Sequence, residues 1–228
     1  NHSLARLGRA ASLIDLNRDQ DAQADLEIVV TRFARHPLAA YLNALILAKK
    51  KDYSGAQEAL QEVGAALDRH MPSIFLAGAI HYALNQHEQA VKSLSFYVGQ
   101  RPENVRARKL LGAALVRKKE PRQAIEVLES MAQKPNADAQ LLTLIGSAYM
   151  QIGKFNDGAE YFRRAAEIAP DVAAIQTRLA LGNLARGKAN DAVGQLERAL
   201  DLDPGERRAA MLLALVKMRK KDYDGALK

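Results

Sequence analysis

The chain has 228 residues, a formal net charge of +7, and 48% apolar beside 26% charged residues. This balance excludes an intrinsically disordered chain, because enough apolar surface is present to build a core. The absence of cysteine excludes a disulfide framework, a thiolate metal site and a cysteine nucleophile. No apolar stretch reaches the roughly 18 residues that a membrane-spanning helix needs, so no membrane span is expected in this sequence.

The sequence repeats itself at a fixed spacing. The phrase KKDYSGA at residues 50–56 returns as KKDYDGA at residues 220–226, which is 170 residues, or five times 34, further on. Steps of 34 residues from two starting points meet only small residues: Ala22, Ala56, Ala90, Ala124, Gly158, Ala192 and Ala226 in one series, and Ala10, Ala44, Gly78, Gly112, Gly146, Ala180 and Ala214 in the other. A period without slippage indicates one structural unit written many times.

The repeats follow one another along the whole chain. They begin at Ser3, Pro37, Met71, Val105, Ala139, Ala173 and Arg207, and the last is cut after 22 residues. In each repeat the two small residues lie twelve positions apart and have apolar residues three and four positions away, which predicts two short amphipathic helices that cross at the small residues. We therefore expect an all-α chain without strands, a single α-α superhelix (solenoid) over residues 1–228 with two helices in each of seven repeats.

The prolines agree with these helices. Three fall in first turns, at Pro37, Pro72 and Pro121, and four follow second helices, at Pro102, Pro135, Pro170 and Pro204. Proline is tolerated in a first turn, but it destabilises a helix interior by about 3 kcal/mol. No proline contradicts the predicted helix-turn-helix units.

One segment of the fifth repeat carries a specific motif, LLTLIGSAYMQIGKFNDGAEYFRRAAEIAP. It resembles a tetratricopeptide repeat through Leu142, Ile145, Gly146, Tyr149, Gly158, Phe162, Ala165 and Pro170. The resemblance covers the whole chain and is strongest from Met71 to Pro204. It implies a superhelix whose first helices line a concave groove, and a protein-binding scaffold that holds an extended peptide or protein segment there.

A narrower resemblance lies in three consecutive stretches. HPLAAYLNALILAKKKDYSGAQEALQEV, PSIFLAGAIHYALNQHEQAVKSLSFYV and NVRARKLLGAALVRKKEPRQAIEVLE are similar to the repeat lipoproteins of PEP-CTERM and exopolysaccharide systems. This similarity implies a periplasmic or outer-membrane-associated protein of a sorting or polysaccharide-export system, with a cytoplasmic protein as the alternative. A structural component of a periplasmic secretion assembly is a second functional reading, and a nucleic-acid-binding solenoid is the least favoured.

The sequence argues against catalysis. No glycine-rich phosphate loop or GxSxG motif occurs, and the five histidines have neither cysteine nor a carboxylate cluster beside them. We expect no catalytic, cofactor-binding or metal-binding residue and no small-molecule substrate. The basic runs are short and fall between helices, which is typical of solvated turns rather than of a nucleic-acid interface.

The candidate binding residues lie on the exposed stripe of the first helices. The second and third repeats offer Tyr41, Phe75 and Tyr82, the fourth offers Arg106, Lys109 and Arg117, and the fifth offers Gln140, Thr143, Ser147 and Gln151. We expect an extended segment to bind there, with apolar groups on the aromatic side chains and acidic groups on the basic ones. Packing between neighbouring repeats is the alternative for the aromatic residues, and a solvated face is the alternative for the basic residues.

The last repeat stops soon after its second helix should begin. Terminal repeats of such stacks need a polar outer face, whereas this end would leave an apolar flank uncovered. The sequence therefore predicts that the natural chain continues past Lys228, or that this end is covered by end-to-end self-association.

Overall fold

The structure is a computed structural model that describes residues 2–135 and 137–219. The chain forms two compact units, Asn1–Ala114 and Leu115–Lys228, and the boundary between them falls within one helix. Every regular element in the described part is helical, and no strand occurs there. The expected all-α fold class is confirmed.

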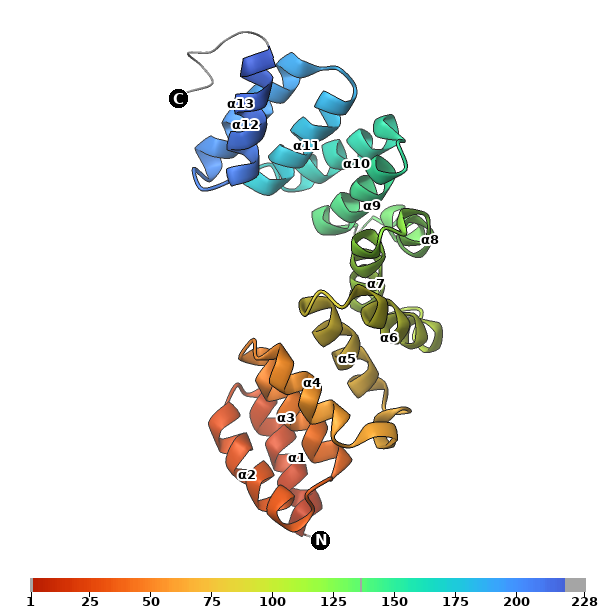
Figure 1. Ribbon diagram of the computed structural model, residues 1–228, viewed down its shortest axis with the longest axis vertical. Helices are drawn as coiled ribbons and strands as arrows, with labels where there is room; N and C mark the ends of the chain where they lie inside the picture. The colour runs from red at the N-terminus through yellow and green to blue at the C-terminus, as the bar shows by residue number, and fades with distance from the viewer. Residues whose placement is uncertain (1, 136, 220–228) are drawn as a thin grey trace. The chain divides into compact units, whose positions relative to one another are not determined.

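The helices of the first unit alternate as first and second members of the repeats (Figure 1). They are α1 (His2–Asp15), α2 (Asp19–Arg32), α3 (Pro37–Lys49), α4 (Tyr53–Gln61), the 3₁₀ helix η1 (Gly64–Leu67), α5 (Met71–Ala83), α6 (His87–Gln100) and α7 (Val105–Lys118), the last of which contains the unit boundary.

The second unit continues the same alternation. Its helices are α8 (Pro121–Ala132), α9 (Ala139–Gln151), α10 (Phe155–Ile168), α11 (Ala173–Ala185), α12 (Ala189–Leu202) and α13 (Arg207–Arg219). The second helix expected in the seventh repeat, and the end contact expected beside it, lie outside the described residues.

Within each unit, first helices pack against their own second helices and against neighbouring first helices, as α3 and α11 show. In the first unit α3 contacts α4, α1 and α5, and in the second unit α11 contacts α12, α9 and α13. First helices of one unit therefore lie side by side, and a continuous stripe of their side chains forms one face of that unit.

The small residues mark the crossings of paired helices, as the period predicts. A Cβ added at Gly78 would lie 2.7 Å from Leu94 of the partner helix, and one added at Gly146 would lie 2.7 Å from the ring of Phe162. Ala44 and Ala56 are fully buried at the equivalent crossing between α3 and α4. Close approach of the helix axes thus depends on the absence of bulk at these positions.

The turn inside each repeat has one conformation. A residue with positive φ follows the first helix every 34 positions, at Asn17, Lys51, Asn85, Lys119, Gly153 and Gly187. In the fourth repeat the amide of Glu120 donates to the carbonyl of Leu115 and that of Lys119 to Val116, the bonding pattern of a Schellman motif. The first helix therefore ends at the same place in each of these repeats.

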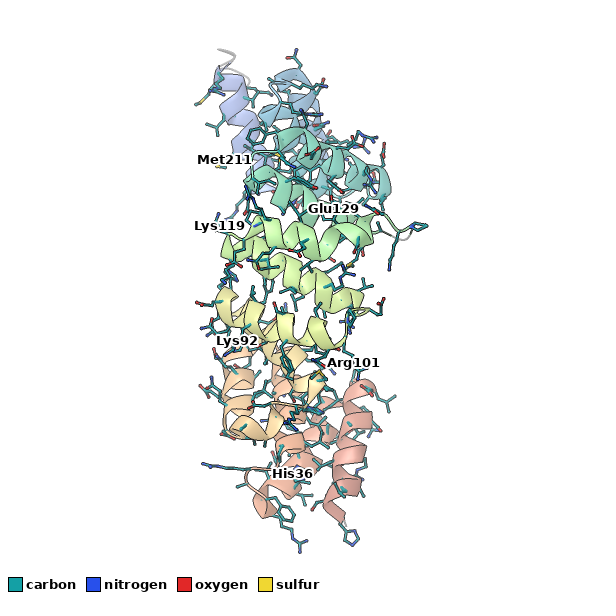
Figure 2. The ribbon with its side chains drawn as sticks, turned by 90° about the vertical axis from the view of Figure 1, so that its right-hand side faces the viewer. His36, Lys92, Arg101, Lys119, Glu129 and Met211 are labelled. Atoms are coloured by element: carbon teal, nitrogen blue, oxygen red, sulfur yellow. The ribbon has the colours of Figure 1, made fainter. Side chains whose placement is uncertain are left out.

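Lys119→Gly should stabilise the second unit by about 0.5–1 kcal/mol. Lys119 has a φ of 70°, a region that costs a residue with a Cβ about 1–2 kcal/mol and costs glycine nothing, while the greater freedom of unfolded glycine offsets part of the gain. Figure 2 labels Lys119 at its turn. Urea denaturation followed by circular dichroism measures the change.

Gly153→Ala is the matched control with the opposite expected sign, because Gly153 occupies the same turn one repeat later at a φ of 77°. It should destabilise the unit, and a loss of stability in both variants would contradict a local backbone origin for the effect.

Candidate binding surfaces on the first helices

Tyr41 of α3 is half-buried between two neighbouring repeats. Its ring meets the ring of His70 edge-on at a centroid distance of 5.0 Å. It also packs against the core that α1 and α3 share and against the core between α3 and α5. Burial raises the pKa of its phenol, so Tyr41 is neutral at physiological pH. The structure shows Tyr41 in contact with neighbouring repeats and leaves part of the ring accessible.

Phe75 and Tyr82 of α5 are also half-buried, and each pairs with a ring of α6. Phe75 lies 5.2 Å from Tyr97 and Tyr82 lies 6.0 Å from His87, measured between ring centroids. Within the described residues none of the three predicted aromatic residues stacks on another of the three. They are separate partly exposed rings on the first helices of one unit.

The predicted basic residues are distributed over both units. Arg106, which is exposed, and Lys109, which is partly buried, lie in the part of α7 that belongs to the first unit. Arg117 is exposed and belongs to the second unit. Its charge acts on Arg178 of α11, a residue that was not predicted from the sequence.

A cluster of polar groups centres on Arg178 of α11. The guanidinium of Arg178 donates through Nη1 to Oγ of Ser147 on α9 at 3.0 Å, and that hydroxyl in turn donates to the carbonyl of Thr143 at 2.7 Å. Gln151, one turn further along α9, donates from Nε2 to the carbonyl of Val116 at 3.2 Å.

Adjacent first helices thus place polar side chains next to one another. We call the four residues around this guanidinium the Arg178 site; they are Arg117, Ser147, Arg178 and Arg208.

The charges around Arg178 are mainly positive. Burial lowers its pKa first, and the positive charges of Arg208 and Arg117 lower it further, while Glu206 acts in the opposite direction. Arginine keeps its proton at any physiological pH, so the lowered pKa describes a cation in an unfavourable place. Within the described residues Arg178 has no carboxylate partner. Among the described residues one N–H of this half-buried guanidinium is bonded, to Ser147, and the remaining donors can bind an anionic group.

Arg178 was not among the binding residues predicted from the sequence, although the period contained a signal for it. The same position of five other repeats holds leucine, at Leu42, Leu76, Leu110, Leu144 and Leu212. A charged residue at a position that is otherwise apolar breaks the core-forming pattern and requires an explanation of its own. The period also contained a signal for Arg208, because Arg208 occupies the position that the predicted binding residue Arg106 occupies three repeats earlier.

The described residues hold no group of three or more histidine, aspartate or glutamate side chains that could bind a metal ion. No helix among the same residues has the length and apolar character that crossing a membrane requires.

Comparison with protein families gives a match over most of the sequence. One tetratricopeptide repeat profile matches residues 7–73, 75–140 and 177–228, and a second matches residues 139–172. Among curated proteins, Protein FlbA of Caulobacter vibrioides is 26% identical over 166 residues. That alignment covers 72% of this chain but 28% of FlbA, so the chain spans less than a third of that relative.

Solved structures show the same fold at low sequence identity. MamA (residues 41 to the end) from Desulfovibrio magneticus RS-1 has a TM-score of 0.65 at 21% identity, covering 73% of this chain and 94% of MamA. YrrB, described as a tetratricopeptide repeat protein with an unusual peptide-binding site, has a TM-score of 0.65 at 15% identity and covers 82% of this chain and 96% of its own.

Proposed function

The chain belongs to the tetratricopeptide repeat family, and we propose that it is a non-catalytic scaffold that binds an acidic protein segment at the Arg178 site. The family and the stacked first helices support a protein-binding role. The proposal that the segment is acidic depends on one observation, the half-buried Arg178 guanidinium that lacks a carboxylate partner among the described residues. An acidic side chain or a chain-terminal carboxylate would accept two hydrogen bonds from it.

Ser147 and the two flanking arginines define how such a segment would be held. The Arg178–Ser147 hydrogen bond fixes the guanidinium plane on its α9 side, so its remaining donors are oriented before a ligand arrives. Arg117 and Arg208 are both exposed, and exposed charges mainly accelerate and orient association. Arg178 should therefore carry most of the affinity and its neighbours most of the salt dependence.

The first unit offers a surface of different chemistry on its own first helices. We propose that Tyr41, Phe75 and Tyr82 contact apolar groups of a bound segment, and that Arg106 and Lys109 contact acidic ones. Partly exposed aromatic rings commonly act as anchors at protein interfaces, which supports this assignment.

The cellular setting is proposed on sequence similarity alone. The similarity of three stretches to repeat lipoproteins of PEP-CTERM and exopolysaccharide systems supports a periplasmic or outer-membrane-associated scaffold in sorting or polysaccharide export. Sorting or polysaccharide-synthesis genes beside the gene of this protein would agree with that setting, and their absence would favour the general scaffold.

Arg178→Leu should weaken binding of an acidic peptide by about tenfold or more, because a charge-assisted hydrogen bond contributes about 1.5–3 kcal/mol. The substitution installs the residue that five other repeats carry, so the fold should tolerate it. The probe is acetylated hexaglutamate, titrated by fluorescence anisotropy at low and moderate salt, with hexaglutamine as the uncharged comparison.

Arg198→Leu is the matched control, because Arg198 is exposed on the second helix α12 and forms only a 3.5 Å ion pair with Asp171. It should leave the affinity unchanged. Equal binding of hexaglutamine would show that charge does not drive binding, and equal losses in the two variants would show that the peptide responds to overall charge. Either result would reject the Arg178 site.

A further inference from the structure

A cavity of about 600 Å³ opens in the first unit between α4, η1, α5 and α6. Its walls are mainly apolar and include Leu60, Leu67, Ile74 and Phe96. Pockets of this size with a few polar groups are typical of sites for small organic molecules. None of the predicted binding residues lines it, and no small-molecule ligand is expected from the sequence.

In the second unit the space equivalent to this cavity is filled by side chains. Helices α9 and α10 have the bounds of α5 and α6 shifted by two periods, or 68 residues. Counterparts of seven cavity-lining residues, Leu60, Gly64, Ser73, Ile74, Ala77, His81 and Ser93, belong to one packed cluster there, as Leu128, Ala132, Leu141, Leu142, Ile145, Tyr149 and Tyr161. The chain itself therefore shows which groups can fill this space.

The difference in volume arises mainly at three positions. Ala77, His81 and Ser93 stand where the second unit has Ile145, Tyr149 and Tyr161. The two tyrosine rings stack at 5.5 Å between centroids, with an interplanar angle of 11°. Alanine in place of isoleucine, serine in place of one tyrosine and the smaller histidine ring in place of the other leave a space suited to a flat aromatic group.

The wall that α4 contributes to the cavity is also shorter than its counterpart. α4 ends at Gln61, whereas the equivalent helix α8 continues to Ala132, which is three residues beyond the position equivalent to Gln61. Gly64, at a φ of 49°, then turns the chain into η1. The cavity is thus formed by backbone as well as by side chains.

The cavity offers one cation to a negatively charged group of a ligand. Lys92 of α6 lines it, whereas the same position holds Glu58, Glu126 and Glu160 in three other repeats. Among the described residues no ion pair includes Lys92. Figure 2 labels its position. Asp68 also lines the cavity and carries the opposite charge.

The remaining titratable group of the lining adds no charge at neutral pH. Burial lowers the pKa of His81, and a hydrogen bond to the backbone of Gln89 opposes this only in part. His81 is therefore uncharged at pH 7.5, and Lys92 is the one cation among the described lining residues.

We propose that this cavity binds a small aromatic molecule that carries a carboxylate. The ring occupies the space that Ile145 and Tyr161 fill in the second unit, beside His81, and the carboxylate pairs with Lys92. This site is separate from the Arg178 site, because the two lie in different units and share no residue.

The test titrates 2-naphthoate and its uncharged analogue 2-naphthamide into the protein by isothermal titration calorimetry at pH 7.5. The wild-type protein should bind 2-naphthoate about fivefold more tightly than 2-naphthamide, the effect of one accessible ion pair.

Lys92→Glu should remove this preference for 2-naphthoate, and Asp68→Asn should increase it. Lys188→Glu, an exposed lysine of the second unit, is the control and should change nothing.

Two cavity-filling variants separate the cavity from the rest of the surface. Ala77→Ile and Ser93→Tyr install residues of the filled unit and should abolish binding of both probes, while circular dichroism and thermal unfolding show that the fold is retained. Failure of the wild-type protein to bind 2-naphthoate at millimolar concentration would overturn the proposal. So would binding that survives in a folded Ala77→Ile or Ser93→Tyr variant, or equal affinity for the two probes.

Discussion

Phe162→Ala should lower the free energy of unfolding of the second unit by about 3–5 kcal/mol, the cost of removing a fully buried aromatic side chain. Phe162 is 1% exposed, and its ring lies between Gly146 of α9 and Gly182 of α11. A Cβ added at Gly146 would approach the ring to 2.7 Å, and one added at Gly182 would approach it to 3.3 Å. Three helices are therefore packed closely around one side chain, and they cannot collapse into the space that alanine leaves.

Phe155→Ala on the same helix is the matched control, because Phe155 is 44% exposed. It should cost less than about 1 kcal/mol, since an exposed ring gains little from burial. Urea denaturation gives the overall change, and amide hydrogen exchange of α9, α10 and α11 gives the local one. Similar losses in both variants would contradict the close packing of Phe162.

Asp25→Asn should destabilise the first unit by about 2 kcal/mol at neutral pH, because it weakens charge-assisted hydrogen bonds to a buried group. Asp25 of α2 is 1% exposed and joins α2 to α1. Its carboxylate accepts from Nε and Nη2 of Arg9, each at 2.5 Å, and from Nη1 of Arg6 at 2.9 Å. The arginines reach it from the surface and cover it with their side chains.

The same site should make stability depend on pH. The hydrogen bond from Arg9 holds the pKa of Asp25 below its ordinary value, assisted by Arg6 and opposed by burial. The folded state therefore favours the ionised form, and this contribution is complete above the unfolded pKa of about 4. It is lost as the pH falls through the lower pKa of the folded state, because protonation removes the acceptor charge.

The stability difference between wild type and Asp25→Asn should accordingly shrink between pH 6 and pH 3. Asp21→Asn is the control, because Asp21 is 55% exposed and pairs with Arg18 at 2.7 Å. An exposed pair of this kind contributes about 0–1 kcal/mol. A difference for Asp25→Asn that stays constant down to pH 3 would show that the carboxylate charge is not the source of its stabilisation.

The sequence by itself determined the local structure and the order of the repeats. The spacing of small and apolar residues predicted paired helices, and the positions of Pro37 and Pro121 predicted where two of them begin. These signals are local, because amphipathic periodicity and helix capping act within one or two turns of the chain. These local signals are accurate here because the same residue types recur at the same positions in several repeats, so a prediction made for one repeat can be checked against the others.

The tertiary structure decided which of these positions do something other than pack. Arg178 breaks the leucine series, but only the fold shows its guanidinium bonded to Ser147 and close to Arg117 and Arg208. The cavity beside Lys92 likewise depends on small residues in α5 and α6 and on the early end of α4. None of these features would create the cavity alone. Charge fields and empty volume are sums over several helices, so they exist only after those helices are packed together.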